Sequence, residues 1–202
     1  MSTLFIQFAR APVPGRVKTR MVPALGEEGA CQLHRELLQW TCRNLLATGC
    51  HVELWLDADS QDAAIGACAE RGADISRRQV GGDLGDRMYN ALQDGLGRYT
   101  QVILVGSDCP WLTPQQLQCA ADELSQQEVV VQPAQDGGYV LIGARRIGPD
   151  VFDGVAWGGA DVFSQTGARL RQGGYRWAAL QALPDVDRPA DLPAWEVLRG
   201  GA

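Results

Sequence analysis

The sequence predicts an α/β fold in which a mostly parallel central sheet is flanked by helices on both faces. Short apolar segments alternate with helical patterns, several of these segments are nearly continuous in Val, Ile and Leu, and polar residues follow three of them. Strands buried on both faces have such continuous apolar composition, and parallel sheets bind ligands at the carboxyl ends of their strands. We therefore expect a binding site at that edge of the sheet.

Each expected strand is a short apolar run, and the helices are expected where apolar residues recur at helical spacing. The expected strands are Leu4–Ala9, His51–Leu56, Val102–Gly106, Val129–Gln132, Tyr139–Gly143 and Tyr175–Leu180. The expected helices are Glu27–Ala47, Gln61–Arg71, Leu84–Leu96 and Pro114–Leu124, with a last helix starting near Pro189. The C-terminal third is less regular. No repeat or linker divides the chain, so we expect a single domain over residues 1–202.

Composition narrows the class of protein. The chain has 202 residues, of which 46% are hydrophobic and 21% charged, as in an ordinary globular protein with a buried core. Its net charge of -6 argues against a nucleic acid or an anionic membrane as the main partner. No apolar run approaches the roughly 20 residues of a membrane helix, so we expect a cytoplasmic protein. The six cysteines form no metal-binding pattern, and we expect them reduced.

The loop after the first expected strand is the most unusual segment. Arg10, Arg16, Lys18 and Arg20 lie close together in a protein of negative net charge. Like charges at this spacing repel one another, and a bound phosphate would neutralise them. If the segment is extended, the alternating cations at 16, 18 and 20 project from one edge. The alternative is a solvated basic loop with no ligand.

This loop is not a P-loop, because Gly15 is its single glycine and lies between Pro14 and Arg16, with a second proline at Pro12. Proline offers no N–H group, so phosphate binding would depend on side chains. Gly82 and Arg87 form a second candidate contact. They lie in the segment G-G-D-L-G-D-R-M, where glycines precede a helix whose N-terminus presents free N–H groups, and Asp83 is expected as its N-cap.

Two aspartates follow expected strands. Asp108 follows the Val102 strand, and a carboxylate there requires a cation, a metal or several hydrogen-bond donors. Mg²⁺ or Mn²⁺ fits, since such ions combine one or two carboxylates with phosphate oxygens. The structural alternative is that Asp108 caps the helix that begins near Pro114 or organises the turn. Asp136 precedes two glycines and is a candidate second metal ligand or base, although a plain hairpin turn would use the same residues.

These segments resemble the GT-A superfamily of nucleotide-diphospho-sugar transferases and, within it, the DUF2064 family of small bacterial glycosyltransferase-like proteins, some of them linked to arsenosugar biosynthesis. The matching blocks are F-A-R-A-P-V-P-G-R-V-K-T-R-M at 8–21, G-G-D-L-G-D-R-M at 81–88, V-G-S-D-C-P-W-L at 105–112, D-G-G-Y-V-L-I-G at 136–143 and D-V-D-R-P-A-D-L at 185–192. The resemblance implies a Rossmann-like GT-A domain that binds a nucleotide over the first loop, with a divalent ion on Asp108.

The sequence departs at two places from the motifs of related nucleotidyltransferases and glycosyltransferases. The G-x-G-x-R turn of common nucleotidyltransferases is missing, and Gly106-Ser107-Asp108 keeps only the last carboxylate of the D-x-D triplet of glycosyltransferases. We expect a metal-dependent transfer of a glycosyl group from a nucleotide sugar to a small acceptor, with Asp108 and Asp136 as catalytic residues. The alternatives are a nucleotidyltransferase that joins an NTP to a phosphorylated small molecule, and a non-catalytic nucleotide-binding protein.

Overall fold

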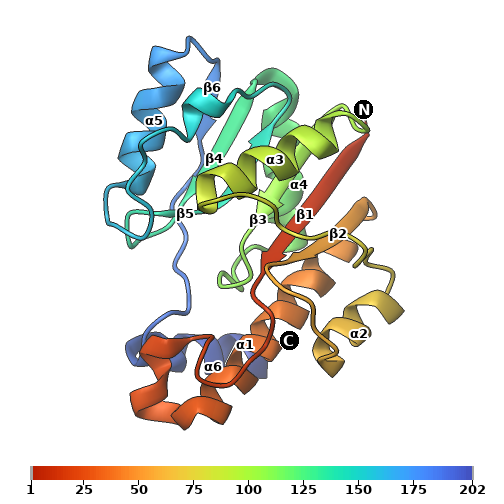
Figure 1. Cartoon of the computed structure of the whole chain (residues 1–202), viewed down its shortest axis with the longest axis vertical. Helices are drawn as coiled ribbons and strands as arrows, with labels where there is room; N and C mark the ends of the chain where they lie inside the picture. The colour runs from red at the N-terminus through yellow and green to blue at the C-terminus, as the bar shows by residue number, and fades with distance from the viewer. Residues whose placement is uncertain (1, 202) are drawn as a thin grey trace.

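The computed structural model describes residues 2–201, which form one six-stranded sheet between helices (Figure 1). The strands are β1 (Thr3–Ala9), β2 (His51–Leu56), β3 (Gln101–Val105), β4 (Val129–Pro133), β5 (Tyr139–Ala144) and β6 (Trp177–Ala179). The α-helices are α1 (Val22–Leu46), α2 (Ala63–Glu70), α3 (Leu84–Leu96), α4 (Pro114–Gln126), α5 (Val162–Gln172) and α6 (Leu192–Gly200). Short 3-10 helices are η1 (Thr19–Met21), η2 (Pro149–Val151) and η3 (Pro189–Asp191).

The sheet has the order β2-β1-β3-β5-β4-β6. β1 is parallel to β2 and β3, and β4 is parallel to β6, whereas β5 is antiparallel to both of its neighbours. The predicted mostly parallel α/β fold is therefore confirmed. Because only β5 is reversed, the carboxyl ends of the other strands and the amino end of β5 lie at one edge.

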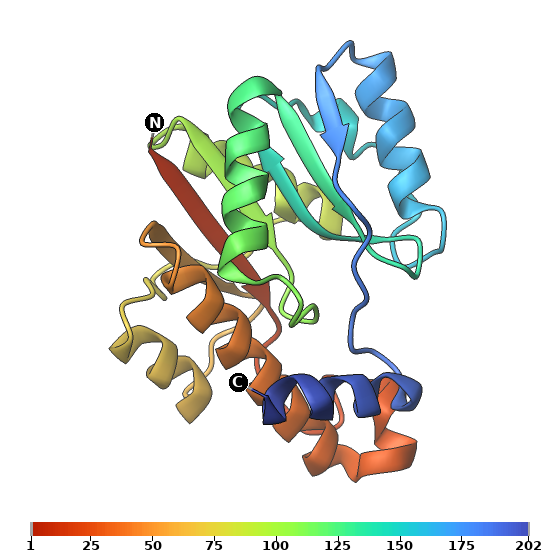
Figure 2. The same cartoon turned by 180° about the vertical axis from the view of Figure 1, so that it is seen from behind.

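Helices cover both faces of the sheet, and the alternation of side chains along β1 shows how. Phe5 packs in a cluster with residues of α1, α2 and α4, whereas Leu4 and Ile6 pack in a second cluster with residues of α3 and α5. Figures 1 and 2 show α3 and α5 on the opposite face of the sheet from α1 and α4. All three side chains are buried. Burying a large apolar side chain on each face stabilises the fold by roughly 1.5–3 kcal/mol per residue.

A third cluster joins the two ends of the chain beyond the carboxyl edge of the sheet. α6 lies against α1 there (Figure 2), and Trp195 packs with Met21, Leu37 and Val186. Trp195 also meets Trp40 edge to face, with ring centroids 5.1 Å apart. This packing fixes the segment that follows β6 beside the loop that follows β1.

Two helices of the structure, α1 and α5, differ from the expectation. α1 begins five residues earlier than expected, but Gly26 interrupts it with a φ of 71°, so the regular helix starts at the expected Glu27. α5 has no counterpart among the expected elements. Thr166 and Gly167, which are weak helix formers, occupy its centre, and packing decides its structure, since Val162, Thr166 and Leu170 are buried.

None of the helices within residues 2–201 combines the length and the apolar composition needed to cross a lipid bilayer.

The turn between β4 and β5 generates a stability prediction. Gly137 has a φ of 94°, and a Cβ atom there would lie 1.9 Å from the carbonyl oxygen of Ala160. Gly137→Ala should therefore lower the free energy of unfolding by roughly 2–5 kcal/mol, combining backbone strain with overpacking. Gly49→Ala is the matched control, because Gly49 has a φ of 75° but open space around it, and it should cost only about 1–2 kcal/mol. Urea denaturation measures both, and equal losses would contradict the clash.

Candidate functional site

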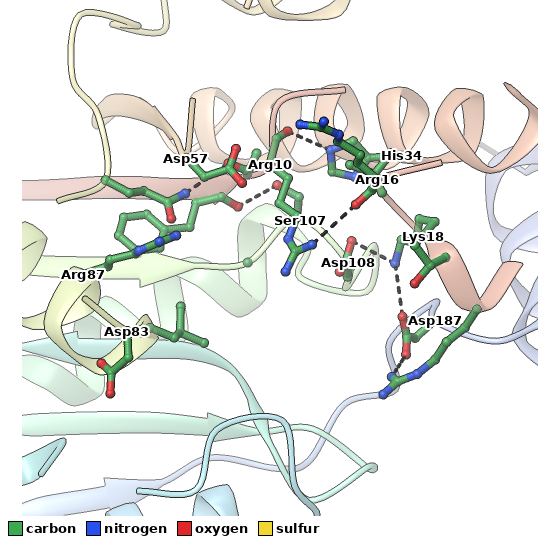
Figure 3. A pocket seen from close by; sticks show the side chains of 18 residues that line it. Arg10, Arg16, Lys18, His34, Asp57, Asp83, Arg87, Ser107, Asp108 and Asp187 are labelled. Atoms are coloured by element: carbon green, nitrogen blue, oxygen red, sulfur yellow. Dashed lines mark hydrogen bonds and ion pairs between the residues drawn. The ribbon is translucent and has the colours of Figure 1, made fainter. Parts of the chain in front are cut away.

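The carboxyl edge of the sheet holds a cavity of about 630 Å³, here called the main cavity (Figure 3). Residues 8–10, 16–20, 34, 57, 79, 83, 84, 87, 106–108 and 187 line it. They come from the end of β1, from the loops after β1, β2 and β3, from α1, from α3 and the segment before it, and from the segment before α6. The cavity therefore lies at the edge where the parallel strands predict a binding site.

Most of the sequence-predicted site residues meet in this cavity. Its lining includes the predicted residues Arg10, Arg16, Lys18, Arg20, Arg87 and Asp108. Gly15 and Gly82 are not among the lining residues. The backbone N–H of Gly82 donates to Asp86 Oδ2 at 3.1 Å. The predicted contact of these two glycines with a nucleotide therefore stays a prediction.

The cationic loop is bent, so the condition of an extended segment is not met. Lys18 has left-handed backbone angles (φ 48°, ψ 42°) and leads into η1. The side chains at 16, 18 and 20 consequently do not form one row. Arg16 and Arg20 are exposed, whereas Lys18 is buried.

Lys18 forms the central ion pair of the site. Its Nζ lies 2.9 Å from Asp108 Oδ1 and 4.0 Å from Asp187 Oδ1, and it donates to the carbonyl oxygen of Val186 (Figure 3). The backbone N–H of Val186 in turn donates to the carbonyl of Asp108 at 2.8 Å. An ammonium group buried to this extent requires such compensation. Lys18 thus joins the loops after β1 and β3 to the C-terminal segment.

The remaining cations fall into two groups. Arg20 is paired with Asp187, whose hydrogen bond raises the pKa of the guanidinium. Within residues 2–201, Arg10, Arg16 and Arg87 form no ion pair with a carboxylate. Arg10 and Arg87 reach only backbone carbonyls, each at 3.4 Å. These three arginines therefore keep their hydrogen-bonding capacity for an anion in the main cavity.

A buried network fixes the loop that carries Asp108. Gln7 Nε2 donates to Ser107 Oγ and to the carbonyl of Leu38, both at 2.9 Å, and Ser107 Oγ donates to the carbonyl of Phe8 at 2.9 Å. The helix-cap alternative for Asp108 is wrong, because Thr113 caps α4. The side chain of Asp108 is 48% exposed and faces the cavity.

Sequence reasoning missed several lining residues. Asp57 follows β2 directly and accepts from the backbone N–H of Ala11 at 2.8 Å. Its position after a parallel strand is the same signal that identified Asp108. Gln79 donates to carbonyls of β1 and β2, and no local pattern marks it. Asp187 lies far from the first loop in the sequence, yet it pairs with two cations of that loop.

A smaller cavity of about 170 Å³, here called the side cavity, adjoins the main one. Its lining residues are Gly106, Asp108, Cys109, Ala134, Asp136, Gly138, Tyr139, Val140 and Asp185. Gly106 and Asp108 line both cavities. Asp136 lies in the turn between β4 and β5, where its Oδ1 accepts from the N–H of Gly138 at 2.9 Å. It is therefore both a turn residue and a wall of the side cavity.

Asp185 has the most perturbed carboxyl group of this region. Burial raises its pKa to about 6, with further contributions from the negative charges of Asp136, Asp187 and Asp108, while Lys18 opposes the shift. Four carboxylates therefore act on one another around the junction of the two cavities.

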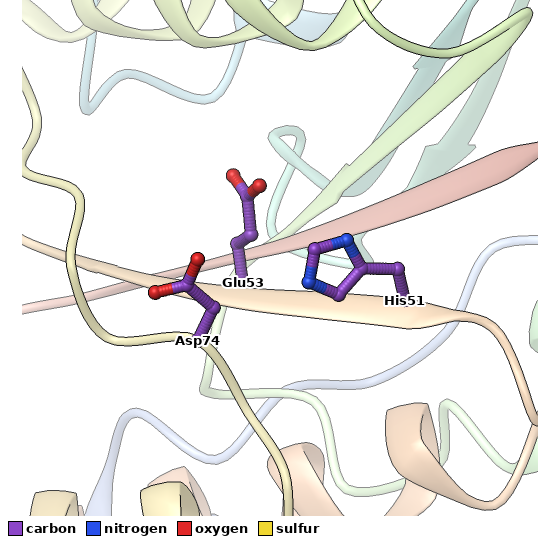
Figure 4. A group of neighbouring side chains, drawn as sticks. All are labelled: His51, Glu53 and Asp74. Carbon is purple, nitrogen blue, oxygen red and sulfur yellow. The ribbon is translucent and has the colours of Figure 1, made fainter.

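A compact group of potential metal ligands lies outside both cavities. His51, Glu53 and Asp74 have ligand atoms within 4.8 Å of one another near the start of β2 (Figure 4). Both oxygens of the buried Glu53 are bound by Arg98, at 2.6 and 3.1 Å, and Trp55 Nε1 also donates to this carboxylate. A guanidinium already neutralises Glu53, so this group fits an ion-pair network better than a metal site.

The shifted pKa of Asp185 predicts a pH-dependent stability. The folded value of about 6 exceeds the ordinary 3.8, so this carboxyl favours folding below about pH 4, and the contribution is lost as the pH rises through 6. Asp185→Asn cannot ionise and should raise the free energy of unfolding at pH 8 by about 1 kcal/mol, or roughly 2–4 °C in Tm. Thermal denaturation at pH 4.5 and pH 8 measures this. Asp122→Asn, on the exposed side of α4, is the control and should show no pH-dependent difference.

Comparisons with known proteins agree with this architecture. A "putative nucleotide-diphospho-sugar transferase" from Desulfovibrio desulfuricans G20 is 34% identical, with a TM-score of 0.84 over 93% of this chain and 84% of that chain. CMP:2-keto-3-deoxy-manno-octonic acid synthetase complexed with CTP shares the fold at 13% identity, with a TM-score of 0.64 over 100% of this chain and 99% of that chain.

A glucosyl-3-phosphoglycerate synthase from Mycobacterium tuberculosis, in complex with Mn²⁺, UDP and phosphoglyceric acid, shares the fold at 10% identity. Its TM-score is 0.57 over 96% of this chain and 73% of that chain. No curated protein matches the chain. The bacterial family described as "Uncharacterized protein conserved in bacteria (DUF2064)" matches residues 41–159. The resemblance found in the sequence is therefore confirmed, and the chain belongs to the DUF2064 family.

Proposed function

We propose that this protein is a divalent-metal-dependent transferase that moves a glycosyl group from a nucleotide sugar to a small acceptor. The observation that carries the proposal is the arrangement of charge in the main cavity. Among the residues that the structure describes, Arg10, Arg16 and Arg87 have no carboxylate partner, and Asp108 faces the same space. The 34% identical relative described as a nucleotide-diphospho-sugar transferase supports the same class of donor.

The free arginines would bind the diphosphate of the donor. Guanidinium groups form short, charge-assisted hydrogen bonds with phosphate oxygens. When the bond between the sugar and the diphosphate breaks, negative charge grows on the leaving group, and the arginines stabilise it. Lys18 is already bound to Asp108, Asp187 and Val186, so its main part is to position Asp108.

The donor set beside Lys18 fits Mg²⁺ or Mn²⁺. Asp108 and Asp187 both line the main cavity, and both offer carboxylate oxygens, the ligands that hard divalent ions prefer. Burial raises the pKa of Asp185 first, and the negative charges of Asp136, Asp187 and Asp108 raise it further, so a cation bound beside these carboxylates would relieve part of their repulsion. A bound ion would supply Lewis-acid stabilisation of the diphosphate oxygens. Asp136 lines only the side cavity, so we assign it to the acceptor rather than to the ion.

The acceptor would be activated from the side cavity. Asp136 is exposed there, and within residues 2–201 it accepts a hydrogen bond only from the backbone of its own turn. It can take the proton of an acceptor hydroxyl while that oxygen bonds to the sugar carbon and the diphosphate leaves with the electron pair of the broken bond. This step requires no covalent intermediate on the protein.

Nucleotidyl transfer is the second candidate. It is favoured by the likeness of the whole chain to a synthetase complexed with CTP. Both reactions would use the same arginines and Asp108, but their products differ. Incubation with Mn²⁺ and a panel of donors decides between them: release of a nucleoside diphosphate from a nucleotide sugar supports glycosyl transfer, and release of pyrophosphate from an NTP supports nucleotidyl transfer. Nucleotide binding without either product would indicate a binding protein and contradict both.

Replacement of Asp108 tests the metal assignment. Asp108→Asn should lower divalent-dependent turnover on the order of 10²-fold, because the amide cannot provide a carboxylate ligand. The amide oxygen can still accept from Lys18, so circular dichroism should report an intact fold. Asp122→Asn is the control for removal of a negative charge. Unchanged turnover in Asp108→Asn would refute the assignment.

Replacement of single arginines tests the phosphate site. Arg16→Gln and Arg87→Gln should each weaken the binding of a nucleoside diphosphate about tenfold and leave the affinity for the matching nucleoside unchanged, since each loses charge-assisted hydrogen bonds to phosphate. Isothermal titration calorimetry measures both affinities. Arg71→Gln, an exposed residue beside α2, should change neither. Equal losses for nucleotide and nucleoside would show that the arginines do not contact phosphate.

A further inference from the structure

The side cavity differs from the main cavity in the sign of its charge. The free arginines of the main cavity come from the loop after β1 and from α3, whereas the β4–β5 turn and the segment before α6 wall the side cavity. Its charged lining residues are Asp108, Asp136 and Asp185, and its nine lining residues include no Arg, Lys or His. The two cavities are contiguous at Asp108, so one ligand in each would meet there.

Lys18 neutralises the charge of the side cavity only in part. Lys18 contacts Asp108 but also lies near Asp187 and donates to the carbonyl of Val186. Asp136 accepts only a backbone N–H group, and no hydrogen bond or ion pair of Asp185 is found within residues 2–201. Near neutral pH this cavity therefore carries a net negative charge.

We infer that the acceptor enters the side cavity and is a small uncharged or cationic hydroxyl compound rather than a phosphorylated or carboxylated one. This inference rests on the proposed function and names the class of acceptor. Hydroxyl and ammonium groups donate hydrogen bonds to the carboxylates of Asp136 and Asp185, whereas a phosphate or carboxylate would be repelled by both.

Size and polarity agree with this class of acceptor. A volume of about 170 Å³ holds roughly six water-sized groups, at about 30 Å³ each, which suits the reacting end of a polyol or a single sugar. Tyr139, Val140 and Ala134 supply less polar walls against which a carbon skeleton packs. A bound donor would not reverse this charge, because its diphosphate would balance the charge of a divalent ion that Asp108 would hold.

Matched pairs of probes test the inference. Glycerol is compared with glycerol 3-phosphate, and glucose with glucose 6-phosphate, with ethanolamine as a cationic probe. Calorimetry measures their binding to the free protein and to the protein loaded with Mn²⁺ and whichever nucleoside diphosphate most raises its Tm. We expect each phosphorylated member to bind at least about tenfold more weakly than its uncharged partner. Equal binding within the pairs, or preference for the phosphorylated members, would overturn the inference.

Charge variants show whether the preference arises in the side cavity. Asp185→Asn and Asp136→Asn should each reduce the discrimination against phosphorylated probes several-fold, whereas Asp122→Asn should leave it unchanged. An unaltered preference in both cavity variants would assign it to another surface and overturn the inference. A different result would contradict the proposed function, namely a lack of nucleotide binding or of product release. The titrations of the free protein do not depend on the proposed function.

Discussion

The buried ammonium group of Lys18 is the interaction on which the site depends. An unpaired charge at this depth would cost several kcal/mol, so the fold must bring oxygen atoms to it. They come from Asp108 after β3 and from Val186 and Asp187 before α6. Segments separated by more than a hundred residues are thus held at one point of the carboxyl edge. The left-handed backbone of Lys18, which costs about 1–2 kcal/mol, directs the side chain into this position.

The four cations of the loop after β1 fall into two that are paired with carboxylates and two that are exposed. Lys18 and Arg20 are neutralised by the protein's own carboxylates, while Arg10 and Arg16 remain exposed and unpaired with acids in the described part of the chain. A loop with four free cations would repel itself strongly in the absence of a ligand. Pairing with the protein's own carboxylates reduces that repulsion and leaves fewer positive charges for an anion to neutralise. Such a charge balance suits reversible binding of the anion.

The sequence predicts the sheet well because burial on both faces leaves an unambiguous apolar signal in β1 and β3. It also identifies Asp108 and the arginines, since each follows a strand or begins a helix. The bend at Lys18 was missed because no glycine marks it, and only the distant Asp108 and Asp187 explain it. Asp185 and Asp187 were missed as site residues because their position depends on α6 packing on α1, a long-range contact that no local pattern encodes.

The single reversed strand explains why the site has two chemically different halves. In an all-parallel sheet the connection after β4 would cross to the opposite edge before the next strand. Because β5 is antiparallel to β4, a short hairpin turn remains at the carboxyl edge and brings Asp136 beside Asp108. The missing Cβ of Gly137 lets the backbone at Ala160 pack on that turn and hold it in place. The cationic half therefore follows from the parallel strands β1 to β3, and the acidic half follows from the reversal at β5.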